Sequence, residues 1–535
     1  MVSLVLFTPL VAALLLLFIN KERENGLRWF ALIASLLTFV FSLELLRGFD
    51  SSVAGFQFVE KSAWIPDFGI DYHVGVDGIS LFLILLTTFL VPLVIIASWG
   101  DVHKRVKEYL SLFLLLETGM LGAFVAIDLF LFYVFWEVML IPMYFLVGVW
   151  GGERRIYAAI KFLIYTMVGS LLMLVAILYL AYLHNVQEGA LSFNLLQLYN
   201  LNIDSSAQRW LFWAFVFSFA IKVPLFPFHT WLPDAHVEAP TGGSVILAGV
   251  LLKMGTYGLL RFAIPLFPYA AYVYAPILIL LAIFGIFYGA LVAMVQPDLK
   301  KLVAYSSVSH MGFVVLGLFA FNQQGAQGAI FQMLNHGLST GALFLLVGVI
   351  YERRHTRLIS EYGGLWKQVP IYASIFLIAM FSSIGLPGLN GFIGEFLIML
   401  GAFNSLIFRG IASSSSGWGW VLMIFVVSGV VLGAVYMLWM YQRVIFGPLE
   451  NEENKKLTDL SRREVLVFAP LVAMMFVMGL FPTPFLHRME KSVEEILARA
   501  NIARYEQALR EETGDEQLGA QTALLENVLP RNMRP

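Results

Sequence analysis

The chain has 535 residues, of which 59% are hydrophobic and 13% are charged, with a formal net charge of -2 and a mean hydropathy of +0.80. Roughly a quarter of the residues of a soluble protein are charged, so this composition excludes a soluble protein and indicates an integral membrane protein. Cysteine is absent, which excludes disulfides and thiolate-held metal or iron-sulfur centres in this chain. No P-loop or dinucleotide fingerprint occurs, and the near-neutral charge gives no sign of nucleic-acid binding.

Long apolar runs dominate the chain. A run of about 20 apolar residues can cross a bilayer as a helix, and continuously apolar runs of this length do not form barrel strands. The first run lacks a basic n-region and a cleavage site, so we expect it to be a retained span rather than a signal peptide. We expect an all-α protein with about fourteen transmembrane helices, at 2-20, 27-46, 77-98, 108-126, 129-150, 158-183, 209-236, 243-264, 272-295, 302-320, 326-350, 371-402, 419-442 and 465-485.

The basic residues are unequally divided between the two sets of loops. Counted from the first span, the odd-numbered loops hold 20 Lys and Arg residues, whereas the even-numbered loops hold Arg47, Lys61, Arg209, Arg261 and Arg409. The positive-inside rule places the more basic loops in the cytoplasm. We therefore expect a multi-pass protein of a bacterial-type inner membrane, with both termini on the side opposite the cytoplasm.

Two of the expected spans contain helix breakers. Pro224 and Pro227 interrupt the seventh span, and the Gly- and Pro-containing run 385-391 interrupts the twelfth. Five spans separate the two breaks, so spans 4 to 8 and 9 to 13 can form two inverted five-helix repeats with corresponding discontinuous helices. The expected divisions are helices 1 to 3 at 1-107, the first repeat at 108-264, the second at 265-443, a cytoplasmic loop and helix 14 at 444-485, and a polar tail with an amphipathic helix at 486-535.

Ionisable side chains inside apolar spans are costly and usually mark an ion or proton path. Lys222 precedes the first break, and Glu395 follows the second. Lys253 lies about 15 Å from either end of its span, too far for its ammonium group to reach water easily. Glu137 lies beside a proline in the fifth span. The alternative for Glu137 and Lys222 is a purely structural ion pair.

His310 is a fifth main candidate, and five residues are secondary candidates: Glu117, His229, Asp234, His236 and His336. An imidazole pKa near 6.5 suits proton relay, although a core histidine bonded to hydroxyl groups is the alternative for His310 and His336. Glu117 lies mid-span without an identifiable partner. The spacing from His229 to His236 matches no zinc motif, so we expect no metal site.

Several motifs carry a family resemblance. The run from Lys222 to Ser244, with Pro-Phe-His-Thr-Trp-Leu-Pro-Asp-Ala-His-Val-Glu-Ala-Pro-Thr, resembles the antiporter-like subunits of respiratory complex I and of Mrp-type sodium/proton antiporters. The same family has runs similar to Phe-Trp-Glu-Val-Met-Leu-Ile-Pro-Met-Tyr around Glu137, Leu-Leu-Lys-Met-Gly around Lys253 and Gly-Phe-Ile-Gly-Glu-Phe around Glu395. A fourth run, Ala-Tyr-Ser-Ser-Val-Ser-His-Met-Gly, contains His310. The likeness extends from about residue 75 to 485.

The resemblance implies fourteen spans, two inverted repeats and a proton path across the membrane midplane. It implies these roles: Lys222 as gated proton acceptor, Glu137 as its electrostatic switch, Lys253 and His310 as lateral relay and Glu395 as terminal exchange site. A glutamate at the last position is typical of the subunit M branch, whereas subunits L and N usually have lysine.

We therefore expect a proton-translocating membrane subunit of NADH-quinone oxidoreductase. The resemblance implies no cofactor in this chain, with FMN, iron-sulfur clusters and quinone held by partner subunits. The implied partners are other complex I membrane subunits, including homologous antiporter-like ones, and the lipid bilayer. The alternatives are a subunit of an Mrp-type antiporter or of a membrane-bound hydrogenase, and a scaffold whose buried ion pairs only hold helices together.

Overall fold

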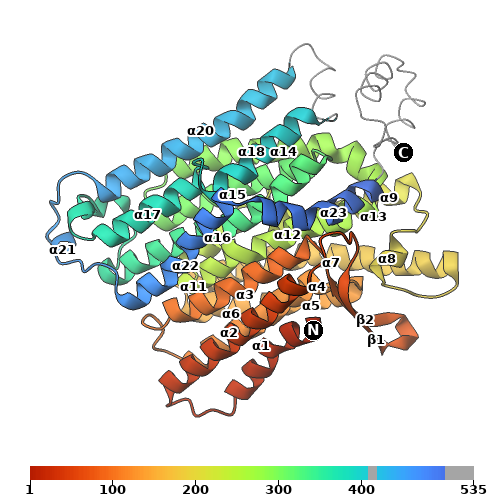
Figure 1. Cartoon of the computed structure of the whole chain (residues 1–535), viewed down its shortest axis with the longest axis horizontal. Helices are drawn as coiled ribbons and strands as arrows, with labels where there is room; N and C mark the ends of the chain where they lie inside the picture. Colours follow the sequence, from red (N-terminus) through yellow and green to blue (C-terminus); the bar gives the residue numbers. More distant parts are fainter. Residues whose placement is uncertain (406, 408–417, 501–535) are drawn as a thin grey trace.

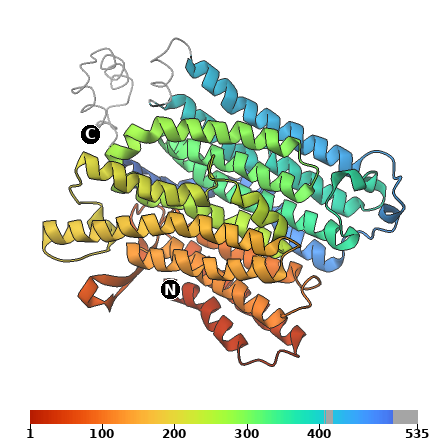
Figure 2. The same cartoon turned by 180° about the vertical axis from the view of Figure 1, so that it is seen from behind.

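The computed structural model describes residues 1-405, 407 and 418-500. Long helices lie roughly side by side, with the N-terminal helices α1 and α2 at one edge of the bundle and α20 at the opposite edge (Figure 1). In the view from behind, the long helix α7 lies on the side of the bundle nearest the viewer (Figure 2). The bundle follows the order of the chain only in part, because the C-terminal helices α22 and α23 return to its middle and contact α16.

In the first half of the chain, α7 packs against α9, and α1 packs against both α2 and α4. Their bounds are α1 Val2–Leu16, α2 Glu24–Gly48, α3 Ser80–Ala97, α4 Val106–Val125, α5 Leu129–Val138, α6 Leu140–Trp150, α7 Arg155–Glu188, α8 Leu195–Leu198, α9 Ser205–Lys222, α10 Trp231–Glu238, α11 Thr241–Ile246, α12 Leu252–Gly258 and α13 Ile264–Leu266.

In the second half, α16 is the central element and packs against α15, α17 and α18. The bounds there are α14 Pro268–Met294, α15 Leu299–Leu318, α16 Gln323–Arg354, α17 Pro370–Ser383, α18 Asn390–Asn404, α20 Trp418–Ile445, α21 Glu452–Lys455, α22 Arg462–Leu480 and α23 Thr483–Ala500; short 3-10 turns are η1 Pro66–Phe68, η4 Ile359–Glu361 and η5 Leu365–Lys367.

The structure confirms an all-α membrane architecture. Each of the fourteen expected segments contains helix, and eleven helices among the described residues are long and apolar enough to cross a membrane. Two further apolar helices, α1 and α17, are shorter. Fourteen crossings and two inverted repeats stay predictions.

Both expected breaks are present. The seventh segment divides into α9 and α10, with residues 223-230 between them, and the twelfth divides into α17 and α18. The fifth segment is also interrupted, since α5 ends at Val138 and α6 begins at Leu140. Pro142 accounts for this, because its ring nitrogen cannot donate to the carbonyl of Val138.

A two-stranded antiparallel hairpin was not expected. Its strands are β1 Gln57–Ile65 and β2 Ile70–Val76, and Gln57 pairs with Val76 at the open end. The turn contains Gly69 at a φ of +66°, a backbone conformation that suits glycine. Because the hairpin lies between two spans, a search for apolar runs passes over it.

The amphipathic helix predicted in the tail is present as α23, which begins at Thr483. Its apolar residues Met489, Val493 and Ile496 are buried against this chain itself. In Figure 1, α23 lies across the bundle beside α12, α13 and α16. The remainder of the predicted tail, 501-535, lies outside the described residues.

Candidate proton-transfer site

Four of the predicted residues form a connected row of buried side chains. Nζ of Lys253 donates a hydrogen bond to Nδ1 of His336 over 2.6 Å. The rings of His336 and His310 have centroids 5.7 Å apart, and Nδ1 of His310 lies 3.1 Å from Oε1 of Glu395. All four are at most 6% exposed, so the row joins a base to an acid through two imidazoles away from solvent.

The hydrogen bonds assign the ring nitrogens of this row. An ammonium group has no acceptor, so Nδ1 of His336 accepts from Lys253. Nδ1 of His310 donates to the Glu395 carboxylate, while its Nε2 accepts from the hydroxyl of Ser383 at 3.3 Å. Among the described residues, Nε2 of His336 has no partner. No hydrogen bond joins the two rings in the described structure, so the step from His336 to His310 is the gap in the row.

Side-chain amides hold Glu395 in place. Nε2 of Gln332 donates to Oε1 of Glu395 at 3.1 Å, and the amide of Asn335 donates to Oε1 of Gln332 at 3.1 Å and to the carbonyl of Asn390 at 2.8 Å. The hydroxyl of Ser382 donates to Oδ1 of Asn390 at 2.6 Å. These residues come from α16 and from both sides of the α17–α18 break, so the break supplies part of the polar surroundings of the carboxylate.

Glycines allow the backbone and the amide side chains to lie close to Glu395. A Cβ on Gly391 would lie 2.0 Å from the carbonyl oxygen of Ser382, and one on Gly394 would lie 2.5 Å from Oε1 of Gln332. Gly385 has a φ of +74°, which favours glycine, and a Cβ there would lie 2.9 Å from Oε2 of Glu395. The Gly-rich sequence of the break is therefore what lets backbone and amides surround Glu395.

Lys253 lies on a helix of mixed geometry. Its α-helical segment, α12, stands between two π-helical segments, η2 Leu247–Leu251 and η3 Leu259–Ala263. Nζ of Lys253 also donates to the carbonyl of Ala248, which lies in η2. The stretch Thr241–Leu266 is enclosed by protein, and all of its residues from Gly242 onward are buried. Single π turns inside α-helices are frequent at functional sites.

Glu137 and Lys222 form a second, separate arrangement. Lys222 is the last residue of α9 and is fully buried, with Nζ 5.1 Å from the ring centroid of Trp136 and 5.5 Å from that of Phe162. Within the described part of the chain, Nζ has no hydrogen-bond partner. The charge of Glu137 acts on Lys222 without a direct ion pair. Glu137 is half-buried, and its Oε1 has no hydrogen-bond partner among the described residues.

The helices that carry the two lysines touch. A Cβ on Gly255, two residues after Lys253, would lie 2.8 Å from the carbonyl oxygen of Phe219 and 3.0 Å from the backbone nitrogen of Val223. Val223 directly follows Lys222. The Glu137–Lys222 arrangement is therefore adjacent to the beginning of the buried row.

Glu117 does not join either arrangement. It lies in α4 and is fully buried, and neither carboxylate oxygen has a hydrogen-bond partner among the described residues. The structure brings no second titratable group from the sequence prediction to it.

The three secondary candidates of the seventh segment are dispersed. Asp234 forms an ion pair with Lys161 at 2.7 Å, and the His229 ring packs on Tyr288 with centroids 5.1 Å apart. His236 is stacked on Phe344, with neither ring nitrogen bonded to a described residue. Within the described residues, no three His, Asp or Glu side chains are grouped closely enough to hold a metal ion.

Sequence reasoning missed a polar cavity of about 550 Å³ at the end of the bundle where α10 meets α11. Buried Lys300 lines it, with Nζ donating to the carbonyl of Ala239 at 2.6 Å. Burial raises the pKa of the Asp101 carboxyl at its edge, where Glu352 also lies. The charges of Lys300 and Lys253 both act on His236. Lys300 went unnoticed because a Lys pair at a helix start is typical of a loop.

The sequence contains a pattern that identifies the amide side chains around Glu395. Gln332, Asn335, His336 and Ser339 recur at positions i, i+3, i+4 and i+7, which places them on one helix face. A polar stripe inside an apolar 32-residue helix is costly unless it faces partners. Attention to that stripe, rather than to ionisable residues alone, would have found the surroundings of Glu395.

Comparisons with known proteins concern the family and the fold of this chain. Residues 126–431 match the family described as NADH:quinone oxidoreductase/Mrp antiporter, TM, and residues 1–126 match NADH-ubiquinone oxidoreductase chain 4, amino terminus. NADH-quinone oxidoreductase subunit M of Rhodobacter capsulatus is 49% identical over 90% of this chain and 93% of that protein.

Two solved structures have the same fold. A chain of respiratory complex I from Thermus thermophilus superposes with a TM-score of 0.81 at 34% identity, covering 93% of this chain and 100% of that one. A chain of the Mrp complex from Dietzia sp. DQ12-45-1b superposes with a TM-score of 0.80 at 19% identity, covering 94% and 99% of the two chains. The second likeness concerns the fold alone.

Proposed function

The chain belongs to the family of membrane subunits common to NADH:quinone oxidoreductases and Mrp antiporters, and we propose that it translocates protons as a membrane subunit of a complex I-type enzyme. The single observation that carries this proposal is the row Lys253–His336–His310–Glu395, in which neighbouring titratable groups are bonded or separated by one ring-to-ring gap. A row used only for structure would not need two imidazoles between its ends.

In this proposal Lys222 accepts a proton under the control of Glu137. Moving one charge against a membrane potential requires about 2.3 kcal/mol per 100 mV, and one pKa unit corresponds to about 1.36 kcal/mol. A change in the distance between the Glu137 carboxylate and the unpartnered Lys222 ammonium is sufficient for a shift of between one and two units. Lys253, His336 and His310 then carry the proton laterally to Glu395, the exchange site.

We also propose the orientation of the subunit in the membrane, its proton entry and its partners. The side with the more basic loops faces the cytoplasm, and the cavity lined by Lys300 admits protons from that side toward Lys253. Electrons are transferred by FMN, iron-sulfur clusters and quinone in partner subunits, because this chain has no cysteine. Its membrane neighbours include homologous antiporter-like subunits.

Two measurements test this function. Mass spectrometry of the purified assembly should find flavin- and iron-sulfur-binding subunits; an assembly that holds only antiporter subunits would favour the Mrp alternative. In vesicles containing the assembly, Lys253→Met should abolish NADH-driven proton uptake while the subunits remain together. Normal uptake in that variant would remove the row from the mechanism.

A further inference from the structure

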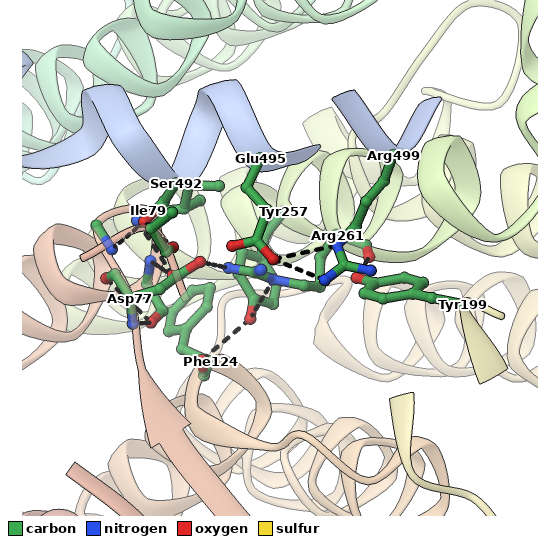
Figure 3. Close-up of polar contacts among 12 residues, drawn as sticks. Asp77, Ile79, Phe124, Tyr199, Tyr257, Arg261, Ser492, Glu495 and Arg499 are labelled. Carbon is green, nitrogen blue, oxygen red and sulfur yellow. Dashed lines mark hydrogen bonds and ion pairs between the residues drawn. The ribbon is translucent and has the colours of Figure 1, made fainter. Parts of the chain in front are cut away.

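A buried ion pair lies apart from the row. Arg261 and Asp77 form it, with side chains only 4% and 3% exposed. Arg261 lies in η3, the π-helical segment that follows the α-helical turn of Lys253, and Asp77 lies just before α3. Figure 3 shows the pair where these two elements meet α23, three parts of the chain that are far apart in sequence.

Both the side chain and the backbone of Arg261 are held. Nε donates to the hydroxyl of Tyr257 at 3.3 Å, and the guanidinium lies 4.8 Å from the ring centroid of Phe56 in the segment before β1. The Tyr257 hydroxyl in turn donates to the carbonyl of Phe124 at 3.1 Å. The carbonyl of Arg261 accepts from the hydroxyl of Tyr199 at 2.7 Å. Four separate segments thus fix one turn of the helix.

Helix α23 covers this cluster. The Ser492 hydroxyl accepts from the backbone N–H of Gly78, the residue after Asp77, at 3.0 Å. A Cβ on Gly78 would lie 2.2 Å from the carbonyl oxygen of Arg488, so the helix lies directly on the backbone there. Arg499 lies 4.9 Å from the ring centroid of Tyr199. As Figure 3 shows, α23 runs along this cluster, with Ser492, Glu495 and Arg499 facing it.

The position of this pair along the helix gives it a role beyond stability. Replacing a buried ion pair by apolar residues of similar volume is often neutral for stability, so stability alone does not explain it. A π turn contains an additional residue and therefore changes the relative rotation of the helical segments on its two sides. Arg261 lies in η3, directly after the segment α12 that carries Lys253, so an anchor at η3 constrains the rotation of that segment.

We propose that Asp77 and Arg261 are positioning residues: their ion pair, covered by α23, holds the π-containing helix in the register at which Lys253 contacts His336. The inference rests on the proposed function of Lys253 in proton transfer. It predicts that the pair affects proton transfer through the 2.6 Å contact between Lys253 and His336, although neither Asp77 nor Arg261 touches the row.

The test uses the intact enzyme in vesicles. The double variant Asp77→Asn/Arg261→Met removes both charges at similar volume, and the Asn oxygen can still accept from the backbone N–H groups of Ile79 and Ser80, so this variant should assemble. Arg261→Lys keeps the charge but cannot bond Asp77 and Tyr257 with one fork. Both should lower proton uptake at least about fivefold, or about 1 kcal/mol in the barrier. The pH profile of uptake should shift, because it reports the ionisation of Lys253 and His336. Asp71→Asn, which breaks the exposed Lys61–Asp71 pair of 2.9 Å, is the matched control and should match the unmodified enzyme.

An unchanged rate and pH profile in either assembled variant overturns the proposal. If the double variant does not assemble, Arg261→Lys decides the question by the same two measurements. Lys253→Met in the same preparation distinguishes the proposed function from the positioning role. Normal proton uptake in Lys253→Met refutes the proposed function. Lost uptake in Lys253→Met together with normal uptake in Arg261→Lys refutes only the positioning role.

Discussion

The buried ammonium group of Lys222 has aromatic rings around it and no hydrogen-bond partner among the described residues. Two ring faces stabilise a cation less than a carboxylate in contact would. Interactions between charges are stronger in a low-dielectric interior than in water. The charge state of Lys222 is therefore sensitive to Glu137, even though the two do not form a direct ion pair.

We expect Glu137→Gln, which keeps shape and removes charge, to lower proton uptake about as far as Glu137→Ala, by at least about tenfold, or about 1.4 kcal/mol. Glu137→Asp should retain part of the activity because the charge remains. NADH-driven proton uptake in vesicles, normalised to assembled enzyme, measures the difference. Equal uptake in the Gln and Asp variants would assign Glu137 a role in packing or hydration rather than in charge coupling.

Glu395→Gln should lower proton uptake much more than Glu117→Gln. Glu395 contacts His310 and Gln332 at 3.1 Å, whereas Glu117 has no bonded partner in the described structure. Both are buried carboxyls, so each is a matched control for the other. The measurement is proton uptake at equal assembly, and similar losses would show that membership of the row is not what matters.

The sequence identified the ionisable members of the row because a charge inside an apolar run is conspicuous. It could not predict that Lys253 bonds His336 rather than a carboxylate, since that contact joins residues 83 positions apart. Neutral amides such as Gln332 and Asn335 were missed because they cost less in a membrane than charges and attract less attention. The roles of all these residues in proton transfer stay predictions.

At the level of elements, helix breaks were predictable and changes of helix type were not. Prolines and clustered glycines identify α9–α10 and α17–α18 from the sequence. The π segments around Lys253 have no such signal, because Leu247–Leu251 and Leu259–Ala263 contain no proline and only one glycine, Gly249. The hairpin of β1 and β2 has strand-like composition but lies where only a loop was considered.

The α17–α18 break should not tolerate even one added methyl group at its closest contact. We expect Gly391→Ala to lower stability by about 1-3 kcal/mol, or to prevent assembly, because overpacking displaces backbone and a Cβ there would lie 2.0 Å from the Ser382 carbonyl oxygen. The thermal inactivation temperature of the purified assembly measures the effect.

Gly433→Ala is the control for this prediction. It lies inside α20, and the nearest atom to an added Cβ is the Tyr436 hydroxyl oxygen at 4.0 Å. This variant should inactivate at the same temperature as the unmodified protein or slightly higher, since alanine favours helix over glycine. Equal destabilisation by both substitutions would contradict the packing argument.

For the whole molecule, α23 connects the end of the described chain to its beginning. It contacts α13 and α16, and Ser492 also donates to the carbonyl of Ala54 at 3.0 Å. The amphipathic pattern predicted this helix, but the pattern alone cannot say whether an apolar face covers lipid, a partner or its own chain. That choice depends on the shape of the bundle, which no local pattern records.

Val493→Asp should release α23 from the bundle, because Val493 is 0% exposed and an unpaired buried carboxylate is costly. Limited trypsin digestion of the membrane-embedded assembly should then cleave faster after Arg488 or Lys491. Glu494→Ala, on the exposed face, is the control and should leave the cleavage rate unchanged. Protection of Val493→Asp equal to that of Glu494→Ala would mean that α23 does not depend on its apolar face.

The complete enclosure of Thr241–Leu266 has a consequence for biosynthesis. A lysine at the centre of an isolated helix opposes membrane insertion by about 2.5-3.5 kcal/mol, and this helix also contains Arg261. Its final neighbour α16 is translated later, so the segment first meets the bilayer without the residue that bonds Lys253. The earlier helices α3 and α9 are already available as neighbours. The segment must therefore enter the membrane by packing against helices that were inserted before it. Its insertion depends on these earlier helices and not only on its own hydrophobicity.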